Sequence, residues 1–183
     1  MSGAAKMGSV ILRLIQLAFA TIVMALIGNM IDDALHGSSS VVNYNLFVPA
    51  FVLLSLLYLI PASLSDKVMF HPILMLIIDG LCCLFAFAGA IALPAKQRVH
   101  SCTNEEYTSN NPVTSGSNYP EKRCREGQAA TAFLWFLWFT FLLSTLYSLW
   151  RVKERFSGGG SGGGRTSQRG SPNRPQAPTM SQV

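Results

Sequence analysis

One acidic residue, Asp79, stands inside the long apolar stretch that runs from Val68 to Ala95. A carboxylate within hydrocarbon is costly, so it either has a polar partner or serves as a proton or ion site. Arg13 and Gln16, near the start of an earlier apolar stretch, are the available partners, although Arg13 can also snorkel to the lipid headgroups. We favour a structural contact, because no second buried ionisable group is present to form a path.

Small residues share the predicted helical face of Asp79, which indicates that this face points into a helix bundle. They are Cys83, Ala86 and Ala90. At about 1.5 Å per residue, Asp79 lies roughly 14 Å from Phe70, the predicted start of its helix, and so close to the membrane midplane. A second stripe of small residues favours close approach of another helix in lipid, although membrane helices are generally rich in alanine and glycine. Its members are Ala18, Thr21, Ala25 and Gly28.

The four cysteines allow three disulfide pairings. Cys82 and Cys83 are adjacent within an apolar stretch, whereas Cys102 and Cys124 bound a wholly polar one. We therefore predict a Cys102–Cys124 disulfide, which places the polar segment on the oxidising side of a membrane. Closing a loop of roughly 20 residues would stabilise the fold by about 3 kcal/mol.

Other chemistry is not indicated by the residue types and spacings. The three histidines, His36, His71 and His100, are isolated from one another and none has metal-ligand spacing. No activated nucleophile, glycine-rich phosphate loop or carboxylate pair occurs, so we expect no catalytic residue, metal or cofactor. The net charge of +5 comes largely from the C-terminal tail, so a nucleic-acid partner is not indicated.

The elements that position these residues are apolar. The chain is 50% hydrophobic and 13% charged, whereas soluble domains average about 25% charged residues. Four apolar blocks are each long enough to cross a bilayer, which takes about 20 residues. They predict an all-α membrane protein, a four-helix bundle with spans at about 10–31, 46–64, 70–93 and 128–150. The membrane domain covers residues 1–156, and a disordered, basic, Gly/Ser-rich tail covers 157–183.

Basic residues predict the orientation of this bundle. Arg151, Lys153 and Arg155 directly follow the last span, whereas the first loop, 32–45, has no Lys or Arg. The positive-inside rule places both termini in the cytoplasm, where these three residues would lie near anionic lipid headgroups. The last loop, 96–127, also carries basic residues, but its cysteine pair supports the outside.

Short motifs around the two loop cysteines resemble a known family. They are residues 98–102 (RVHSC), 123–125 (RCR), 128–130 (QAA), 132–134 (AFL) and the final five residues, TMSQV. With the four-span layout they resemble the fungal non-classical export protein two family, which belongs to the MARVEL-domain tetraspans. The resemblance covers the whole membrane region and the last five residues, while the Gly/Ser linker and the arginines after it match less well.

The resemblance implies a plasma-membrane protein of eisosomes, the furrow-like microdomains of fungal membranes. It implies a role in organising these microdomains, a response to sphingolipids and a link to unconventional protein secretion. The partners it implies are membrane lipids (sphingolipid, sterol or anionic lipid), other eisosome or tetraspan membrane proteins, and further copies of the chain.

Two other functions compete with that of a membrane organiser. A small transporter or export channel using Asp79 would need internal repeats, broken helices or several buried polar groups. A thiol-dependent membrane enzyme would need a Cys-x-x-Cys motif or an exposed reactive thiol, and the sequence shows neither. We therefore expect a non-enzymatic protein.

Overall fold

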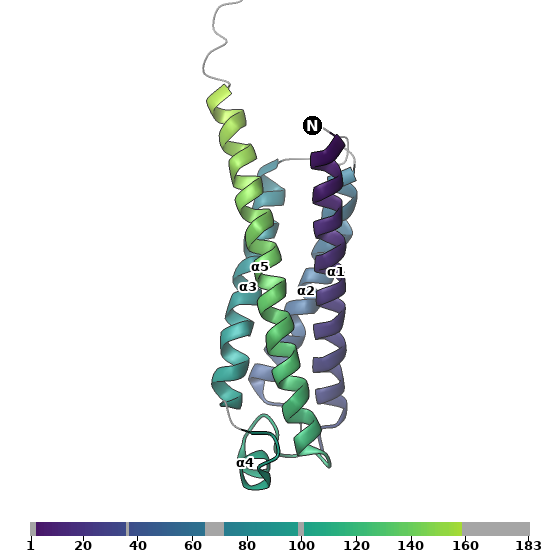
Figure 1. Cartoon of the computed structure of the whole chain (residues 1–183), viewed down its shortest axis with the longest axis vertical. Helices are drawn as coiled ribbons and strands as arrows, with labels where there is room; N and C mark the ends of the chain where they lie inside the picture. Colours follow the sequence, from purple (N-terminus) through teal and green to yellow (C-terminus); the bar gives the residue numbers. More distant parts are fainter. Residues whose placement is uncertain (1–2, 36, 65–71, 99–100, 159–183) are drawn as a thin grey trace, which may run out of the picture.

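Four long helices and one short helix make up the described chain (Figure 1). The structure, a computed structural model, describes residues 3–35, 37–64, 72–98 and 101–158. The helices are α1 (Gly3–Asp32), α2 (Ser40–Leu64), α3 (Pro72–Gln97), α4 (Glu105–Asn110) and α5 (Pro120–Gly158). The predicted turn at 65–69 and the predicted tail beyond residue 158 lie outside the described residues.

The long helices extend beyond the predicted apolar spans. α2 begins at Ser40 rather than near residue 46, and α5 begins at Pro120 rather than near residue 128. α5 also continues to Gly158, so the predicted tail boundary at residue 157 falls inside a helix. The apolar pattern marks where hydrocarbon is crossed, whereas backbone hydrogen bonds continue the helix into the polar flanks.

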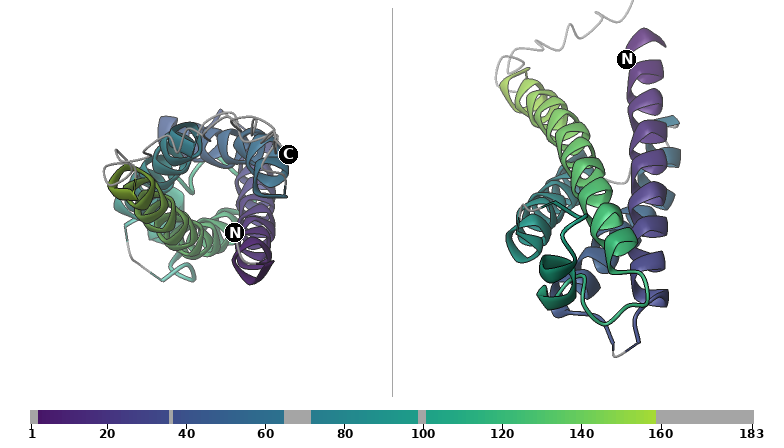
Figure 2. Two further views of the ribbon diagram at one scale, coloured as in Figure 1. Left: turned by 90° about the horizontal axis from the view of Figure 1, so that it is seen from above. Right: turned by 60° about the horizontal axis from the view of Figure 1, so that its bottom comes forward.

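The long helices form an antiparallel bundle with both ends of the described chain at one end and α4 at the other (Figures 1 and 2). We call these the terminal end and the loop end. α1 and α3 each pack against both α2 and α5. Among the described residues, no Cα atoms of α1 and α3 lie within 8 Å of each other. These two helices therefore face each other diagonally across the bundle.

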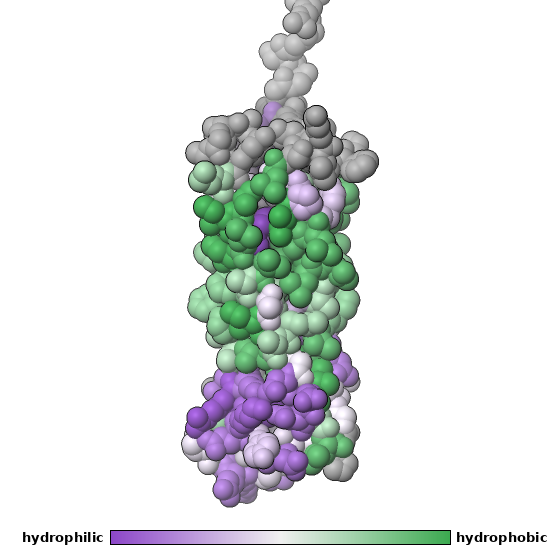
Figure 3. Space-filling model, turned by 90° about the vertical axis from the view of Figure 1, so that its right-hand side faces the viewer, coloured by the Kyte–Doolittle hydropathy of each residue, from purple (hydrophilic) through white to green (hydrophobic). Residues whose placement is uncertain are grey.

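The surface of the bundle is that of a membrane protein. Four helices are long and apolar enough to span a membrane, namely Met7–Asp32, Ser40–Leu64, Ile73–Gln97 and Pro120–Glu154. Only 28–33% of their most apolar windows are buried, so most apolar residues face outward. Figure 3 shows this surface as an apolar band that ends at a hydrophilic cap at the loop end. The protein is a multi-pass membrane protein.

The two small-residue stripes face in different directions. On α3, Ala86 and Ala90 are fully buried with Asp79, as their spacing predicts. On α1, Ala18 and Ala25 are exposed, so no described helix of this chain covers that stripe, and the expected close approach of another helix stays a prediction. The face of α1 that points into the bundle instead carries larger side chains, among them Val23, Ile27 and Met30.

Candidate functional site

A buried ion pair crosses the interior of the bundle near its terminal end. Nη1 of Arg13 lies 2.5 Å from Oδ1 of Asp79, and Nη2 lies 2.7 Å from Oδ2. The two side chains are only 5% and 0% exposed. The two parallel bonds form the fork geometry in which arginine binds carboxylates most strongly. Because α1 and α3 are diagonal, this pair links two helices that have no Cα atoms within 8 Å of each other in the described chain.

Polar side chains of α1 and α5 complete the bonding of the pair. Nη1 of Arg13 also donates to Oε1 of Gln16 at 3.0 Å. Nε2 of Gln16 donates to Oγ of Ser144 at 3.4 Å, and Oγ of Ser148 lies 3.5 Å from Oδ2 of Asp79. Buried charges are tolerated when paired and hydrogen-bonded in this way. The cluster thus joins α1, α3 and α5.

The structure brings together the three residues that the sequence singled out and shows which of the two expected partners bonds to Asp79. Arg13, rather than Gln16, bonds directly to Asp79, and Gln16 bonds to Arg13. Arg13 does not snorkel to the headgroups, because its guanidinium points inward to the carboxylate. Asp79 is also shallower than expected. α3 begins at Pro72, so Asp79 lies about 10 Å along a helix of 26 residues.

A groove of about 360 Å³ opens beside the ion pair at the terminal end. We call it the terminal groove. Its polar wall includes Arg13 and Ser144, and its apolar wall includes Leu12, Met75 and Leu143. At its mouth lies Arg151, whose Cζ is 5.8 Å from the centre of the Tyr147 ring, a cation–π distance.

The predicted membrane-proximal basic residues continue along α5. Arg151 is half-buried at the groove and Lys153 is exposed. Arg155 also lies on α5, but its side chain lies outside the described residues. Because α5 continues past the apolar band, its basic residues extend from the groove toward the headgroup region of the membrane.

At the loop end, a disulfide joins Cys102 to Cys124, with Cα atoms 5.7 Å apart. Both residues are buried, and the bond ties the segment after α3 to the first turns of α5. Cys82 and Cys83 are free, and Cys82 is fully buried among the bundle helices.

The loop that this disulfide closes has more structure than its composition indicates. Asn104 caps α4, its side chain accepting a hydrogen bond from the backbone N–H of Tyr107 at 3.3 Å. The signal in the sequence was an asparagine followed by two glutamates in the first turn. The two loops also meet, since the N–H of Leu35 donates to the carbonyl of Gly116 at 2.8 Å. The cap at the loop end is therefore built from both loops.

The ion pairs on the cap are exposed to solvent. Nζ of Lys122 lies 2.9 Å from Oδ2 of Asp33, and this hydrogen bond raises the pKa of the lysine. Arg123 differs, because it is only 2% exposed and its Nε and Nη1 have no hydrogen-bond partner in the described chain. Burial lowers the pKa of that guanidinium.

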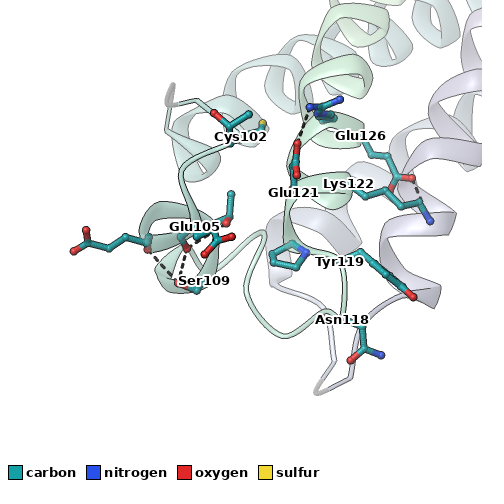
Figure 4. A pocket seen from close by; sticks show the side chains of 13 residues that line it. Cys102, Glu105, Ser109, Asn118, Tyr119, Glu121, Lys122 and Glu126 are labelled. Carbon is teal, nitrogen blue, oxygen red and sulfur yellow. Dashed lines mark hydrogen bonds and ion pairs between the residues drawn. The ribbon is translucent and has the colours of Figure 1, made fainter.

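A cavity of about 960 Å³ lies against the cap (Figure 4). Its lining includes Glu105, Glu121 and Lys122. Glu121 is paired with Arg125 at 2.6 Å and Lys122 with Asp33. Within the described ranges, no group of three or more His, Cys, Asp or Glu residues could hold a metal ion. These ion pairs stabilise the cap, and we assign no catalytic or metal-binding role to the cavity.

Comparison with known proteins identifies relatives along the whole chain. Residues 5–147 match the family model described as MARVEL, a membrane-associating domain. The chain is 35% identical over 174 residues to non-classical export protein 2 of Saccharomyces cerevisiae, covering 94% of this chain and 96% of that protein. It is 34% identical over 176 residues to non-classical export protein 102 of Candida albicans, covering 96% and 98%. A non-classical export protein 2 homolog of Schizosaccharomyces pombe is 28% identical over 145 residues, covering 79% and 78%. No solved structure matches the chain.

Proposed function

This chain belongs to the MARVEL family of membrane-associating domains, and we propose that it organises eisosome-type microdomains of the plasma membrane. The proposal includes a response to sphingolipids and a link to unconventional protein export. The export link is supported by the names of relatives that match 94–96% of this chain at 34–35% identity.

The observation that carries this proposal is the closed interior of the bundle. Arg13 and Asp79 bond to each other, so neither charge is offered to a passing solute. Toward the loop end the interior holds apolar side chains such as Ile27, Leu93 and Leu134, each 0% exposed. The buried amides of Asn45 and Gln97 at this end donate to the backbone carbonyls of Val41 and Cys124. A protein without a polar path in its described part acts through its outer surface, which contacts lipid and neighbouring proteins.

That outer surface also supports association with further copies or with other tetraspan proteins. The α1 stripe of Ala18, Thr21 and Ala25 faces outward in the monomer. Small residues let helix backbones approach closely in lipid, where packing rather than hydrophobicity drives association. Self-association along α1 is therefore part of the proposed organising role.

A transporter or export channel using Asp79 is the second candidate, because the terminal groove reaches Arg13 from the terminal end. The double variant Arg13→Met/Asp79→Leu separates the two functions, since it removes both charges and leaves neither unpaired. An organiser would keep its clustering and export function in this variant. A transporter would lose function while its abundance and location stayed normal.

Imaging tests the main proposal. A tagged copy should coincide with an eisosome marker in the plasma membrane and should redistribute when sphingolipid synthesis is blocked. The marker alone, in cells lacking the protein, serves as the control for organisation. A uniform distribution of the tagged protein that ignores the marker would contradict the proposal.

Orientation is tested by labelling two exposed positions at opposite ends. Asn118→Cys and Lys153→Cys, each in a background with Cys82→Ala and Cys83→Ala, keep the disulfide intact. In intact cells an impermeant maleimide should label residue 118 and spare residue 153 until the membrane is opened. Equal labelling before opening would reject the placement of both termini in the cytoplasm.

A further inference from the structure

α1 and α5 lie close together near the loop end and splay apart toward the termini (Figures 1 and 2). The terminal groove of about 360 Å³ lies where they diverge, and all four long helices contribute residues to it. Ser63 comes from the end of α2 and Met75 from the start of α3. The groove is thus a feature of the whole bundle rather than of one helix surface.

The charges around the terminal groove favour an anion at its mouth. Arg151 lines the mouth, and its stacking on Tyr147 holds the guanidinium in place. None of the described residues that line the groove is acidic. Arg13 is already neutralised by Asp79, so among the described lining residues the charge without an ion-pair partner is that of Arg151.

Part of the lining of the groove is apolar. Leu12 and Met75 line it together with Leu143, which is 44% exposed. The volume is at the lower end of the range of about 300–1,000 Å³ that is typical of small-molecule sites. It is too small for a whole phospholipid, and it suits the upper part of one acyl chain and the glycerol region beside the headgroup.

We propose that the terminal groove binds one anionic glycerophospholipid, with its phosphate at Arg151 and one acyl chain against Leu12, Met75 and Leu143. Basic pockets between membrane helices on the cytoplasmic side commonly bind anionic headgroups. Tyr147 fits this depth, since tyrosine concentrates at the membrane interface. The inference rests on the proposed function in one respect, because the cytoplasmic leaflet is the anionic one.

Native mass spectrometry of the purified full-length chain, released from detergent with phosphatidylserine or phosphatidylcholine of identical acyl chains, tests the headgroup. We expect one phosphatidylserine to be retained in preference to phosphatidylcholine. Arg151→Gln should weaken retention about fivefold, which corresponds to about 1 kcal/mol for one basic residue near an anionic headgroup. Arg125→Gln, the same change of charge at the loop end, is the matched control and should leave retention unchanged.

A second pair of variants tests the acyl-chain wall. Leu143→Trp should fill the groove and abolish retention of both lipids. Leu146→Trp, at a position that is 54% exposed against 44% for Leu143 and does not line the groove, should behave as wild type. Thermal unfolding of each variant checks the fold, and Arg151→Gln remains decisive if tryptophan at 143 destabilises the bundle.

Three results would overturn the proposal: equal retention of the two lipids, equal behaviour of the two arginine variants, or equal behaviour of two folded tryptophan variants. Binding in detergent depends neither on orientation nor on location in the cell. Its failure would therefore leave the organising function standing, and a failure of the imaging experiment would leave the lipid site standing.

Discussion

At the terminal end of the bundle, charge is held inside: Arg13 and Asp79 bond across the diagonal, away from water. At the loop end, the ion pairs lie outside: Lys122 and Arg125 bond to carboxylates on the surface of the cap, and only the unpaired Arg123 among the described charges of the cap is buried. Where hydrocarbon surrounds the helices, a polar group must be satisfied within the protein. Where water surrounds them, ion pairs contribute little, and the covalent Cys102–Cys124 bond supplies the constraint.

Packing of α3 differs between the same two ends. A Cβ added at Gly89, in the half nearer the loops, would lie 2.6 Å from Oδ1 of the buried Asn45 on α2. A Cβ added at Gly80, beside the ion pair, would meet no atom within 4 Å. At the loop half, side chains of α2 therefore pack directly against the backbone of α3 at Gly89, whereas long polar side chains bridge α1 and α3 at the terminal half.

The largest effect should come from removing one half of the buried pair. Asp79→Leu leaves the Arg13 charge buried without its partner, so the free energy of unfolding should fall by about 3–5 kcal/mol. Arg13→Met/Asp79→Leu should recover most of this loss, because no charge is then left unpaired. Thermal unfolding in detergent measures both. Ser148→Ala, which removes only the long contact to Asp79, is the control.

If the double variant were as unstable as Asp79→Leu, packing rather than the ion pair would hold the terminal end. The comparison between the two ends would then lose its basis.

The second effect concerns the loop end. Cys102→Ser should lower the free energy of unfolding by about 3 kcal/mol, because the segment of 22 residues is no longer closed in the unfolded chain. Cys124→Ser should do the same, and the double variant should be no worse than either single variant. Mass spectrometry of protein from cells, handled without reductant, should show both thiols oxidised. Free thiols at both positions would reject the bond.

A third, smaller effect separates the two halves of α3. Gly89→Ala should cost about 1–3 kcal/mol, because the new methyl group overpacks against Asn45. Gly80→Ala, on the same helix with open space around it, is the matched control and should change stability by less than about 1 kcal/mol. Equal melting temperatures for the two variants would show that α2 and α3 are not tightly packed at Gly89.

The smallest effect should come from the surface of the cap. At neutral pH Lys122→Gln should leave the melting temperature nearly unchanged, since the pair with Asp33 is exposed to water and salt. The hydrogen bond to Asp33 raises the pKa of Lys122. Its stabilisation is therefore fully present below the ordinary lysine pKa of about 10.4 and is lost as pH rises through the raised value. Wild type and variant should converge above that pH, and a large difference at neutral pH would contradict the comparison.

The sequence by itself determined the number and approximate position of the spans, because about 20 apolar residues can be buried in lipid without any tertiary information. It also indicated Cys102 with Cys124, since the other two cysteines lie in an apolar stretch. α4 was not predicted, because the loop was judged by its overall polar composition. Its N-cap residue, Asn104, was nevertheless a recognisable signal for the start of a helix.

The tertiary structure alone decided which polar groups meet. Arg13 had two alternatives in the sequence: the headgroups or Asp79. The diagonal placement of α1 and α3 selected Asp79, because it brings the arginine within reach of a fully buried carboxylate. The outward direction of Ala18 and the groove at Arg151 likewise depend on how the helices rotate and splay. Helical periodicity states which residues share a face, but only packing against the other helices decides where that face points.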